Sequence, residues 1–421
     1  MLIISGIAVF TALGPLIVLM AHGYRYDFDD GNLVVTGTLV IKTEPRGATV
    51  ELNDTKLNDT PVTKRFLTPD KYEVEITKNG YRTWRKRVNI YERQVTFLPS
   101  QNEKISLLLS EARALKTEDN VGDIFAFEDS IFFLNVPGTK IFQTSFDTSV
   151  SRVVASSTLA LPEARFIDAR FGGGGPEFIL KSRENYWYVS GDIRYMLPSV
   201  TGHQFAGDAG TVLGINSKND LLRIERTSVS VIANDVLAFK KNGEQIYYLT
   251  KLPAGQFALM RTVDGTRSDK VMDIPSFANG SIVLSTDNQV FLLLDRELYE
   301  VKDNLAGINS NVDSAYWDIH GHFLLYGNSH ETWAYESLAN IPNRLLLRST
   351  VQTLSPFYHK GIAYAFLVEG NEIKAVEGDS SGQPNIYSLL TSEVLKKISI
   401  NEDGDVLAVL DGQSLKLVLI R

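Results

Sequence analysis

Gly37-Thr-Leu-Val-Ile-Lys-Thr-Glu-Pro45-Arg-Gly-Ala-Thr-Val-Glu-Leu-Asn53 is the stretch of sequence that decides the fold. Its apolar residues recur at every second position, at Leu39 and Ile41 and again before Asn53, which is the period of a half-buried β-strand. Pro45 biases the residue before it towards extended backbone, and Gly47 accepts a positive φ, so a turn is expected between them. The stretch therefore predicts two short strands joined by a hairpin.

The same pattern continues to Ile90. Val74 and Ile76 alternate with polar residues, Asn79-Gly80 has the residue types of a tight turn, and Trp84 begins a further alternating strand. These strands predict a small β-sandwich.

The turn Pro45-Arg46-Gly47-Ala48 resembles the PEGA domain, a short β module of prokaryotic surface proteins that is named after its Pro-Glu-Gly-Ala turn. The resemblance extends through Thr60-Pro61 to Asn79-Gly80-Tyr81 and assigns residues 37–98 to this module. Arg46 replaces the Glu of the name, so the resemblance gives the turn no ligand. It implies a surface-protein module.

The amino terminus is apolar, because the twenty residues from Leu2 to Ala21 include no charged side chain. A helix of that length rises about 30 Å, the thickness of the hydrocarbon core. We therefore expect a transmembrane anchor at residues 1–23 and a juxtamembrane linker at residues 24–36. A cleaved signal peptide is the alternative, but the segment lacks a basic n-region and a small-x-small cleavage site.

Charge does not settle the membrane orientation, since Arg25 is followed by Asp27, Asp29 and Asp30. The resemblance to PEGA proteins favours an outside location. The expectation is a single-pass protein of the cell membrane whose carboxyl-terminal domains are extracytoplasmic.

The composition is that of a folded chain of two or three domains, with 421 residues, 44% of them apolar and 22% charged. No cysteine is present, which excludes disulfides, thiolate metal sites and a Cys nucleophile. Residues 37–98 carry twelve basic and eight acidic side chains, a net charge of +4, whereas residues 1–36 carry −2. The remaining residues, 99–421, therefore carry a net charge of −10, and the whole chain carries −8. This acidity argues against a nucleic-acid partner.

Five basic residues gather in the second half of the predicted module: Arg82, Arg85, Lys86, Arg87 and Arg93. A solvated face is the simplest interpretation, and contact with anionic head groups or cell-wall polymers is the alternative.

Residues 99–421 repeat short apolar strands bounded by Asp, Asn, Gly or Ser. The clearest unit, Ala315–Arg348, holds four strands, and similar units recur at spacings of roughly 33 to 44 residues, the range of propeller blades. The predicted starts are Asp123, Arg165, His203, Val236, Phe277, Asp313, Gln352 and Lys396.

This region resembles the TolB-like and WD40-like propellers of bacterial envelope proteins. The last repeat has only three strands, so we expect Lys104–Leu109 to complete it and close the ring. The predicted fold is all-β apart from the amino-terminal helix, with eight blades favoured and seven as the alternative.

Candidate chemistry is weak. Gly378-Asp-Ser380-Ser-Gly382 matches a hydrolase pattern, but no helix follows it, and nothing places His359 and Asp379 as a triad. The remaining candidates are better explained as turns or core: His320 and His322 with Asp318 and His330, Asn401–Asp405, Gly172–Gly175, and the aromatic residues Tyr186, Trp187, Tyr188, Trp317 and Trp333.

We therefore expect no catalytic, metal-binding or cofactor-binding residue. The leading hypothesis is a non-enzymatic protein, held in the membrane through residues 2–21, in which the propeller binds a cell-wall polymer, a glycan or a protein partner. An enzyme acting on envelope polysaccharide and a purely structural scaffold are the alternatives.

Overall fold

The computed structural model describes the chain except for residues 1–10, 12, 16, 21–22, 27–30, 100–102, 128–129, 147–149, 173, 199, 207–209, 264, 266, 318–322, 337–342, 351–352, 360–363 and 379–382, and it does not place the side chains of residues 201–202 and 353–359. The chain forms two compact units. Unit one is Met1–Glu111 with Glu377–Tyr387 and Arg421, and unit two is Ala112–Val376 with Ser388–Ile420.

The amino-terminal segment is helical at residues 11, 13–15 and 17–20. The rest of the predicted anchor, residues 2–10, 12, 16 and 21, lies outside the described residues. Within the described part of the chain, no helix combines the length and the apolar character needed to cross a membrane.

Unit one contains a β-sandwich, as the alternating pattern predicts. One sheet has the order β6-β5-β8-β9 and the other the order β10-β3-β7, and two strand pairs, β1-β2 and β11-β4, accompany them. The strands are β1 (Tyr24–Tyr26), β2 (Leu33–Val35), β3 (Gly37–Ile41), β4 (Thr43–Glu44), β5 (Thr49–Leu52), β6 (Thr55–Lys56), β7 (Val62–Leu67), β8 (Lys71–Thr77), β9 (Trp84–Asn89), β10 (Val95–Leu98) and β11 (Ile105–Ser106).

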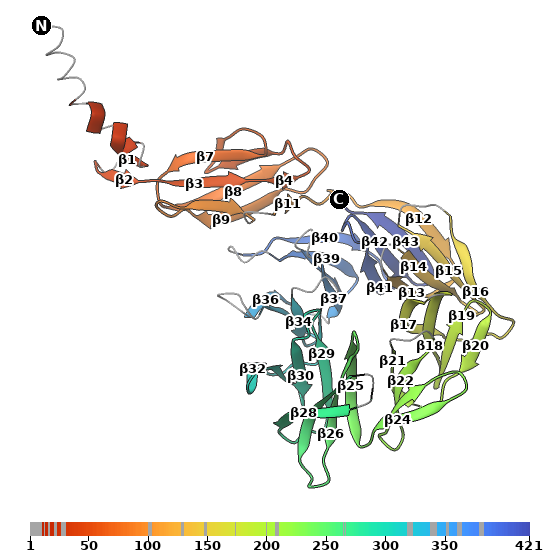
Figure 1. Cartoon of the computed structure of the whole chain (residues 1–421). Helices are drawn as coiled ribbons and strands as arrows, with labels where there is room; N and C mark the ends of the chain where they lie inside the picture. Colours follow the sequence, from red (N-terminus) through yellow and green to blue (C-terminus); the bar gives the residue numbers. More distant parts are fainter. Residues whose placement is uncertain are drawn as a thin grey trace, which may run out of the picture. The chain divides into compact units, whose positions relative to one another are not determined.

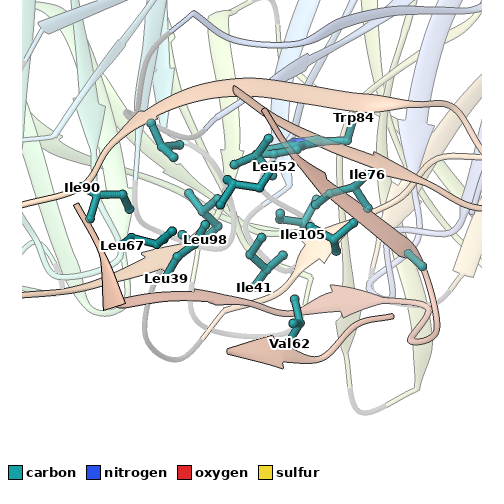
Figure 2. Packing of buried hydrophobic residues seen from close by; sticks show 14 of the residues in the cluster. Leu39, Ile41, Leu52, Val62, Leu67, Ile76, Trp84, Ile90, Leu98 and Ile105 are labelled. Atoms are coloured by element: carbon teal, nitrogen blue, oxygen red, sulfur yellow. The ribbon is translucent and has the colours of Figure 1, made fainter. Parts of the chain in front are cut away.

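A single apolar cluster fills this sandwich (Figure 2). Leu39 and Ile41 reach it from one sheet, and Ile76 and Trp84 reach it from the other, all at most 1% exposed. One buried cluster of this kind is the main source of stability for so small a module.

Hydrogen bonds from Thr60 fix the turn that carries the PEGA resemblance. The Thr60 hydroxyl accepts a hydrogen bond from the Ala48 amide at 3.0 Å and lies 2.5 Å from the Thr43 hydroxyl. The backbone of Thr60 accepts from Gly47 and donates to Ala48. Thr60 of the Thr60-Pro61 pair therefore fixes the conformation of the turn through these hydrogen bonds.

Unit one also contains a buried ion pair with a distant residue. Lys86 Nζ lies 3.2 Å from Glu377 Oε2, and the two side chains are 1% and 5% exposed. Trp84 donates its indole N–H to the other carboxylate oxygen at 2.8 Å, and the Asn385 side-chain amide donates at 2.9 Å. The basic run is therefore divided, because Lys86 is buried while Arg85 and Arg87 alternate with it on the exposed face of β9.

Eight four-stranded antiparallel sheets are present in the described part of the chain after Glu111 (Figure 1). Sheets one to four consist of β13 (Val121–Phe127), β14 (Ser130–Asn135), β15 (Lys140–Ser145) and β16 (Arg152–Ser156); β17 (Arg165–Gly172), β18 (Gly175–Ser182), β19 (Asn185–Ser190) and β20 (Ile193–Met196); β21 (Val200–Phe205), β22 (Val212–Asn216), β23 (Leu221–Ile224) and β24 (Val229–Ala233); and β25 (Val236–Asn242), β26 (Gln245–Lys251), β27 (Phe257–Val263) and β28 (Arg267–Ile274).

Sheets five to eight consist of β29 (Gly280–Leu284), β30 (Val290–Leu294), β31 (Glu297–Val301) and β32 (Leu305–Asn309); β33 (Ser314–Trp317), β34 (Leu324–Gly327), β35 (Glu331–Tyr335) and β36 (Asn343–Arg348); β37 (Thr353–His359), β38 (Tyr364–Glu369), β39 (Glu372–Glu377) and β40 (Ile386–Thr391); and β12 (Arg113–Asp119), β43 (Ser414–Leu419), β42 (Val406–Asp411) and β41 (Leu395–Ile400). Each predicted repeat start lies within three residues of the start of a first strand. The eight-bladed propeller is confirmed.

The closing strand differs from the prediction. Lys104–Leu109 does not pair with the last three strands; Arg113–Asp119 does so as β12, antiparallel to β43. The physical reason is burial, because Ile105 and Leu107 belong to the apolar cluster of unit one. The β12 sequence is mostly exposed and has no apolar alternation, so pattern reasoning passed over it.

Apolar clusters tie neighbouring sheets of unit two together. One joins sheets one and two, others join the successive pairs up to sheets six and seven, and one joins Val121 and Ile131 of sheet one to Val406 and Leu417 of sheet eight. The first strand β41 also contacts β13. Sheet eight, which the β12-β43 pairing builds from both ends of the propeller sequence, therefore packs on sheet one.

Candidate functional site

The topology of unit two collects two sets of loops at one end of the sheets. In an antiparallel four-stranded sheet, the turn between the second and third strands and the link from the fourth strand to the next sheet emerge on the same side. We call this side the connection end. Some of its loops add a buried apolar residue to the clusters between sheets, as Val312 does between sheets five and six, and polar side chains stand beside it.

A polar pocket of about 670 Å³ lies at the connection end of sheets five and six. Its volume is in the range of small-molecule sites. We call it the rim pocket. It is lined by Arg296, Asn311, Asp313, Asn328, Ser329, His330, Glu331, Arg348, Ser349 and Thr350.

Asn328 shapes the rim pocket. Its side-chain oxygen accepts hydrogen bonds from the amides of His330 at 2.9 Å and Glu331 at 3.0 Å. Its side-chain nitrogen donates to the Asn311 carbonyl at 3.1 Å, which ties the turn of sheet six to the link from sheet five. Asn residues commonly form such turns.

Two guanidinium-carboxylate pairs border the pocket. Arg296 lies 2.8 Å from Asp313, and Arg348 lies 2.8 Å from Glu331. Glu331 also accepts a hydrogen bond from the Trp333 indole at 3.2 Å. A guanidinium has five N–H donors, so one carboxylate partner does not exhaust it. The pocket thus presents donors and acceptors side by side, which suits a ligand rich in hydroxyl or amide groups.

Among the residues considered from sequence, His330 lies in this pocket. His320, His322 and Asp318 lie outside the described residues, as do Ser380 and Asp379, and for His359 only the backbone of β37 is described. In the part of the chain that the structure covers, no group of three or more His, Asp or Glu side chains is arranged to hold a metal ion.

The remaining sequence candidates have structural roles. Asn401 accepts hydrogen bonds from the amides of Asp405 and Val406 and so forms the turn between β41 and β42. Gly172 and Gly175 pair at the end of the β17-β18 hairpin.

The aromatic candidates pack within a sheet or between neighbouring sheets. Trp317 stacks on Phe291 with ring centroids 5.4 Å apart, and Trp333 stacks on Tyr326 at 6.4 Å. Trp187 and Tyr188 contribute to apolar clusters between sheets. The interpretation of these rings as core holds for them.

A row of ionisable residues on the first strands was missed by sequence reasoning. The first strands β13, β17, β21 and β41 each have a bulge, and the residues directly after the bulges are Asp123, Asp168, His203 and Lys397. A bulge shifts the two-residue period by one, so the pattern of the sequence hides this shared position.

The two aspartates of this row join neighbouring sheets. Asp123 accepts a hydrogen bond from the Phe166 amide at 2.8 Å and lies 3.3 Å from Lys397 Nζ. Asp168 accepts from the Phe205 amide at 3.1 Å. Burial raises the pKa of Asp168, and the two backbone amides that it accepts from act against this rise. Each carboxylate thus connects its own sheet to the next.

His203 is the exception in this row. It is 8% exposed, its ring lies 3.9 Å from that of Tyr186, and among the described residues neither ring nitrogen has a hydrogen-bond partner. Burial lowers the pKa of His203 to about 4, so the ring is neutral at pH 7.

Comparison with known proteins agrees with this architecture. Residues 36–103 match the PEGA domain. No curated protein matches the sequence. The chain therefore combines a PEGA domain with a β-propeller.

Among solved structures, the C-terminal WD40 domain of Sif2 is similar to this chain with a TM-score of 0.53 and 12% sequence identity, over 74% of this chain and 99% of that domain. A streptogramin B lyase structure is similar over 74% of this chain and 97% of the lyase, with a TM-score of 0.42 and 14% identity. The likeness to the WD40 domain concerns the fold alone.

Proposed function

We propose that this protein is anchored in the cell membrane by its amino-terminal segment and uses its propeller to bind a hydroxyl-rich component of the cell envelope. The rim pocket is the binding site, and the PEGA domain is a spacer on the extracytoplasmic side. The observation that carries the proposal is the pocket itself, where amides, hydroxyls and two guanidinium-carboxylate pairs surround a space of about 670 Å³.

The chemistry of the lining supports a glycan or wall polymer over a simple anion. Each arginine of the pocket already faces a carboxylate, so the site is close to charge balance. The guanidinium groups donate hydrogen bonds in pairs and the carboxylates accept them in pairs. This matches the vicinal hydroxyls of a sugar, because each hydroxyl both donates and accepts a hydrogen bond. A protein partner with a polar surface is the alternative occupant.

The competing enzyme hypothesis draws on the row after the bulges, where Asp168 and His203 have shifted pKa values. Such shifts are typical of active sites. The carboxylates of Asp123 and Asp168, however, accept hydrogen bonds from backbone amides of the next sheet. This favours a structural role for the row and binding as the function.

A binding screen of the full chain in detergent against cell-wall polymers and glycans tests the proposal. We expect at least one polymer to bind and Arg348→Ala to weaken that binding. Unchanged binding in Arg348→Ala would show that the rim pocket is not the binding site. Hydrolysis of a bound polymer would favour the enzyme hypothesis.

The location has its own test. Protease treatment of intact cells should degrade the propeller as it degrades known surface proteins. A propeller that survives while those controls are digested would contradict the extracytoplasmic placement.

A further inference from the structure

After the amino-terminal segment, the exposed apolar side chains of unit one lie near the start of β3. Among the described residues from Tyr24 to Glu111, the large apolar ones that are exposed by about half are Tyr26 (53%), Leu33 (53%), Phe66 (49%), Tyr91 (55%) and Val95 (50%). Exposed apolar residues scattered singly are ordinary, whereas a gathered patch indicates an interaction surface.

Strand pairing brings these residues to the start of β3. In β1-β2, Tyr26 lies opposite Leu33. Leu67, the neighbour of Phe66, lies opposite Gly37, and Val95 lies opposite Thr38.

The turn after β9 completes this end. A Cβ atom on Gly37 would clash with the Tyr91 carbonyl oxygen, so the turn packs directly against the first residue of β3. Three contacts hold the β1-β2 pair there: Thr36 donates to Gly23 at 2.7 Å, Arg93 donates to the Tyr24 hydroxyl at 3.0 Å, and the Arg25 guanidinium lies 3.8 Å from the Phe66 ring centroid.

Phe66 is placed outward by the backbone. The register of β7 against β3 shifts between Gly37 and Thr38, which makes Phe66 the extra residue of a bulge. Its φ is +63°, a conformation that is unusual for a bulky residue. The bulge lets Leu67 remain buried while the Phe66 ring stays half exposed. A strained, exposed aromatic residue indicates a surface that is used.

Basic side chains lie beside the apolar ones on β7 and in the turn after β9, whereas the sequence between Tyr26 and Leu33 carries Asp27, Asp29 and Asp30. Lys64 and Arg65 are exposed on β7, Arg93 is exposed in the turn after β9, and Glu92 is the acidic residue of that turn. Amphipathic aromatic rings mixed with Lys and Arg are the composition of protein surfaces at the headgroup layer of a membrane. We call Tyr26, Leu33, Phe66, Tyr91 and Val95 with these basic residues the interfacial patch.

The chain itself indicates which partner covers this patch. The uncharged sequence Leu2–Ala21 ends three residues before β1, and the Gly23 amide donates to the Met20 carbonyl at 3.1 Å. The four residues from the end of the uncharged sequence to the first residue of β1 span at most about 15 Å. Any membrane that holds the amino-terminal segment is therefore within reach of the interfacial patch.

We propose that the interfacial patch rests in the headgroup layer of an anionic bilayer, so that the PEGA domain is held against the membrane at this end instead of swinging on a free linker. This inference rests on the membrane anchoring of the proposed function. Phe66 and Tyr91 supply aromatic contacts with the interface, and Lys64 and Arg65 supply attraction to anionic lipid.

The chain has no cysteine, so single labels can be placed. Val95→Cys puts an environment-sensitive fluorophore in the patch. Asn79→Cys is the matched control, because Asn79 is exposed on unit one and lies beyond the other end of β8. β8 has seven residues, so its two ends are about 20 Å apart, and the control position lies that far from the end that carries the interfacial patch. The full chain is reconstituted into vesicles of phosphatidylcholine and phosphatidylglycerol that contain lipid-borne quencher.

We expect the label at position 95 to be quenched at least about twofold more than the label at position 79. Lys64→Gln with Arg65→Gln should reduce this difference, most strongly in vesicles that contain phosphatidylglycerol. Protein that floats with the vesicles but shows equal quenching at the two positions would overturn the patch and leave the anchor intact. Protein that does not float would overturn the anchor and the patch together. Shielding that follows protein concentration instead of lipid would assign the patch to a second copy.

Discussion

The two units differ in how they bury apolar residues and in what they expose. Unit one has a single cluster around Ile76 and Trp84 and leaves aromatic and basic side chains exposed at one end. Unit two divides its core among clusters between neighbouring sheets and presents a polar pocket at its loops. From this difference we propose partners of different chemistry for the two units, a lipid surface for the first and a hydroxyl-rich ligand for the second.

The largest effect is expected from the buried ion pair of unit one. Glu377→Ala removes the buried carboxylate that faces Lys86, and breaking a buried ion pair costs about 3–5 kcal/mol of unfolding free energy. Hydrogen exchange measured by mass spectrometry should show faster exchange in β8 and β9. The double variant Lys86→Met with Glu377→Met should recover most of the lost unfolding free energy. If the amides of β8 and β9 exchange in Glu377→Ala as slowly as in the wild type, the ion pair is not part of the core of unit one.

Removing apolar volume should separate the two units. Ile76→Ala and Leu292→Ala each truncate a side chain with no exposed surface, at a cost of about 2–5 kcal/mol. Ile76→Ala should speed exchange throughout the sandwich, because that cluster is its only described core. Leu292→Ala should act mainly on sheets four and five, which share its cluster. Equal spread of the effect across all eight sheets would contradict the division into local clusters.

His203 should make the stability of unit two depend on pH. Its folded pKa of about 4 lies below the ordinary value of 6.5, so between these pH values the unfolded chain binds a proton that the folded chain does not. Its contribution is complete above pH 6.5 and is lost as pH falls towards 4, by about 3 kcal/mol over the whole range.

Urea unfolding of the wild type and His203→Phe at pH 7 and pH 5 measures this term. The variant should lose less stability on acidification than the wild type. His330→Gln, at an exposed position, is the control and should keep the wild-type profile. Identical profiles for wild type and His203→Phe would refute the assignment.

The smallest effect on stability is expected at the rim pocket. Arg348 and Glu331 are 68% and 27% exposed, and exposed pairs contribute at most about 1 kcal/mol. Arg348→Ala should therefore leave the urea midpoint nearly unchanged. A large loss of stability would mean that the pair holds sheet six together and that binding data from this variant cannot be assigned to the pocket.

Much of the fold could be predicted from residues alone. The alternation around Leu39 and the turn at Pro45 predict the sandwich, and the regular spacing of strands predicts eight blades, because both patterns are local. The closing strand could not be found in this way, since Arg113–Asp119 has no apolar alternation and its pairing with β43 spans the whole ring.

The candidate site was less accessible from sequence. His330 was noted, but Arg296 and Arg348 are 52 residues apart in the chain and meet only because the links between sheets emerge at one end. The pairing of Lys86 with Glu377 is equally distant in sequence, so the charge run around Lys86 gave no sign that its middle residue is buried.

The most direct test of the central claim is the affinity of the full chain for the best-binding wall polymer, measured for Arg296→Ala, Arg348→Ala and Arg183→Ala. Arg183 is the matched control, because it lies in the corresponding turn of sheet two and shares the positive φ of Arg296. We expect each pocket variant to bind about tenfold or more weakly, because one charge-assisted contact is lost, and Arg183→Ala to bind like the wild type. Equal affinity in all three variants would contradict the central claim.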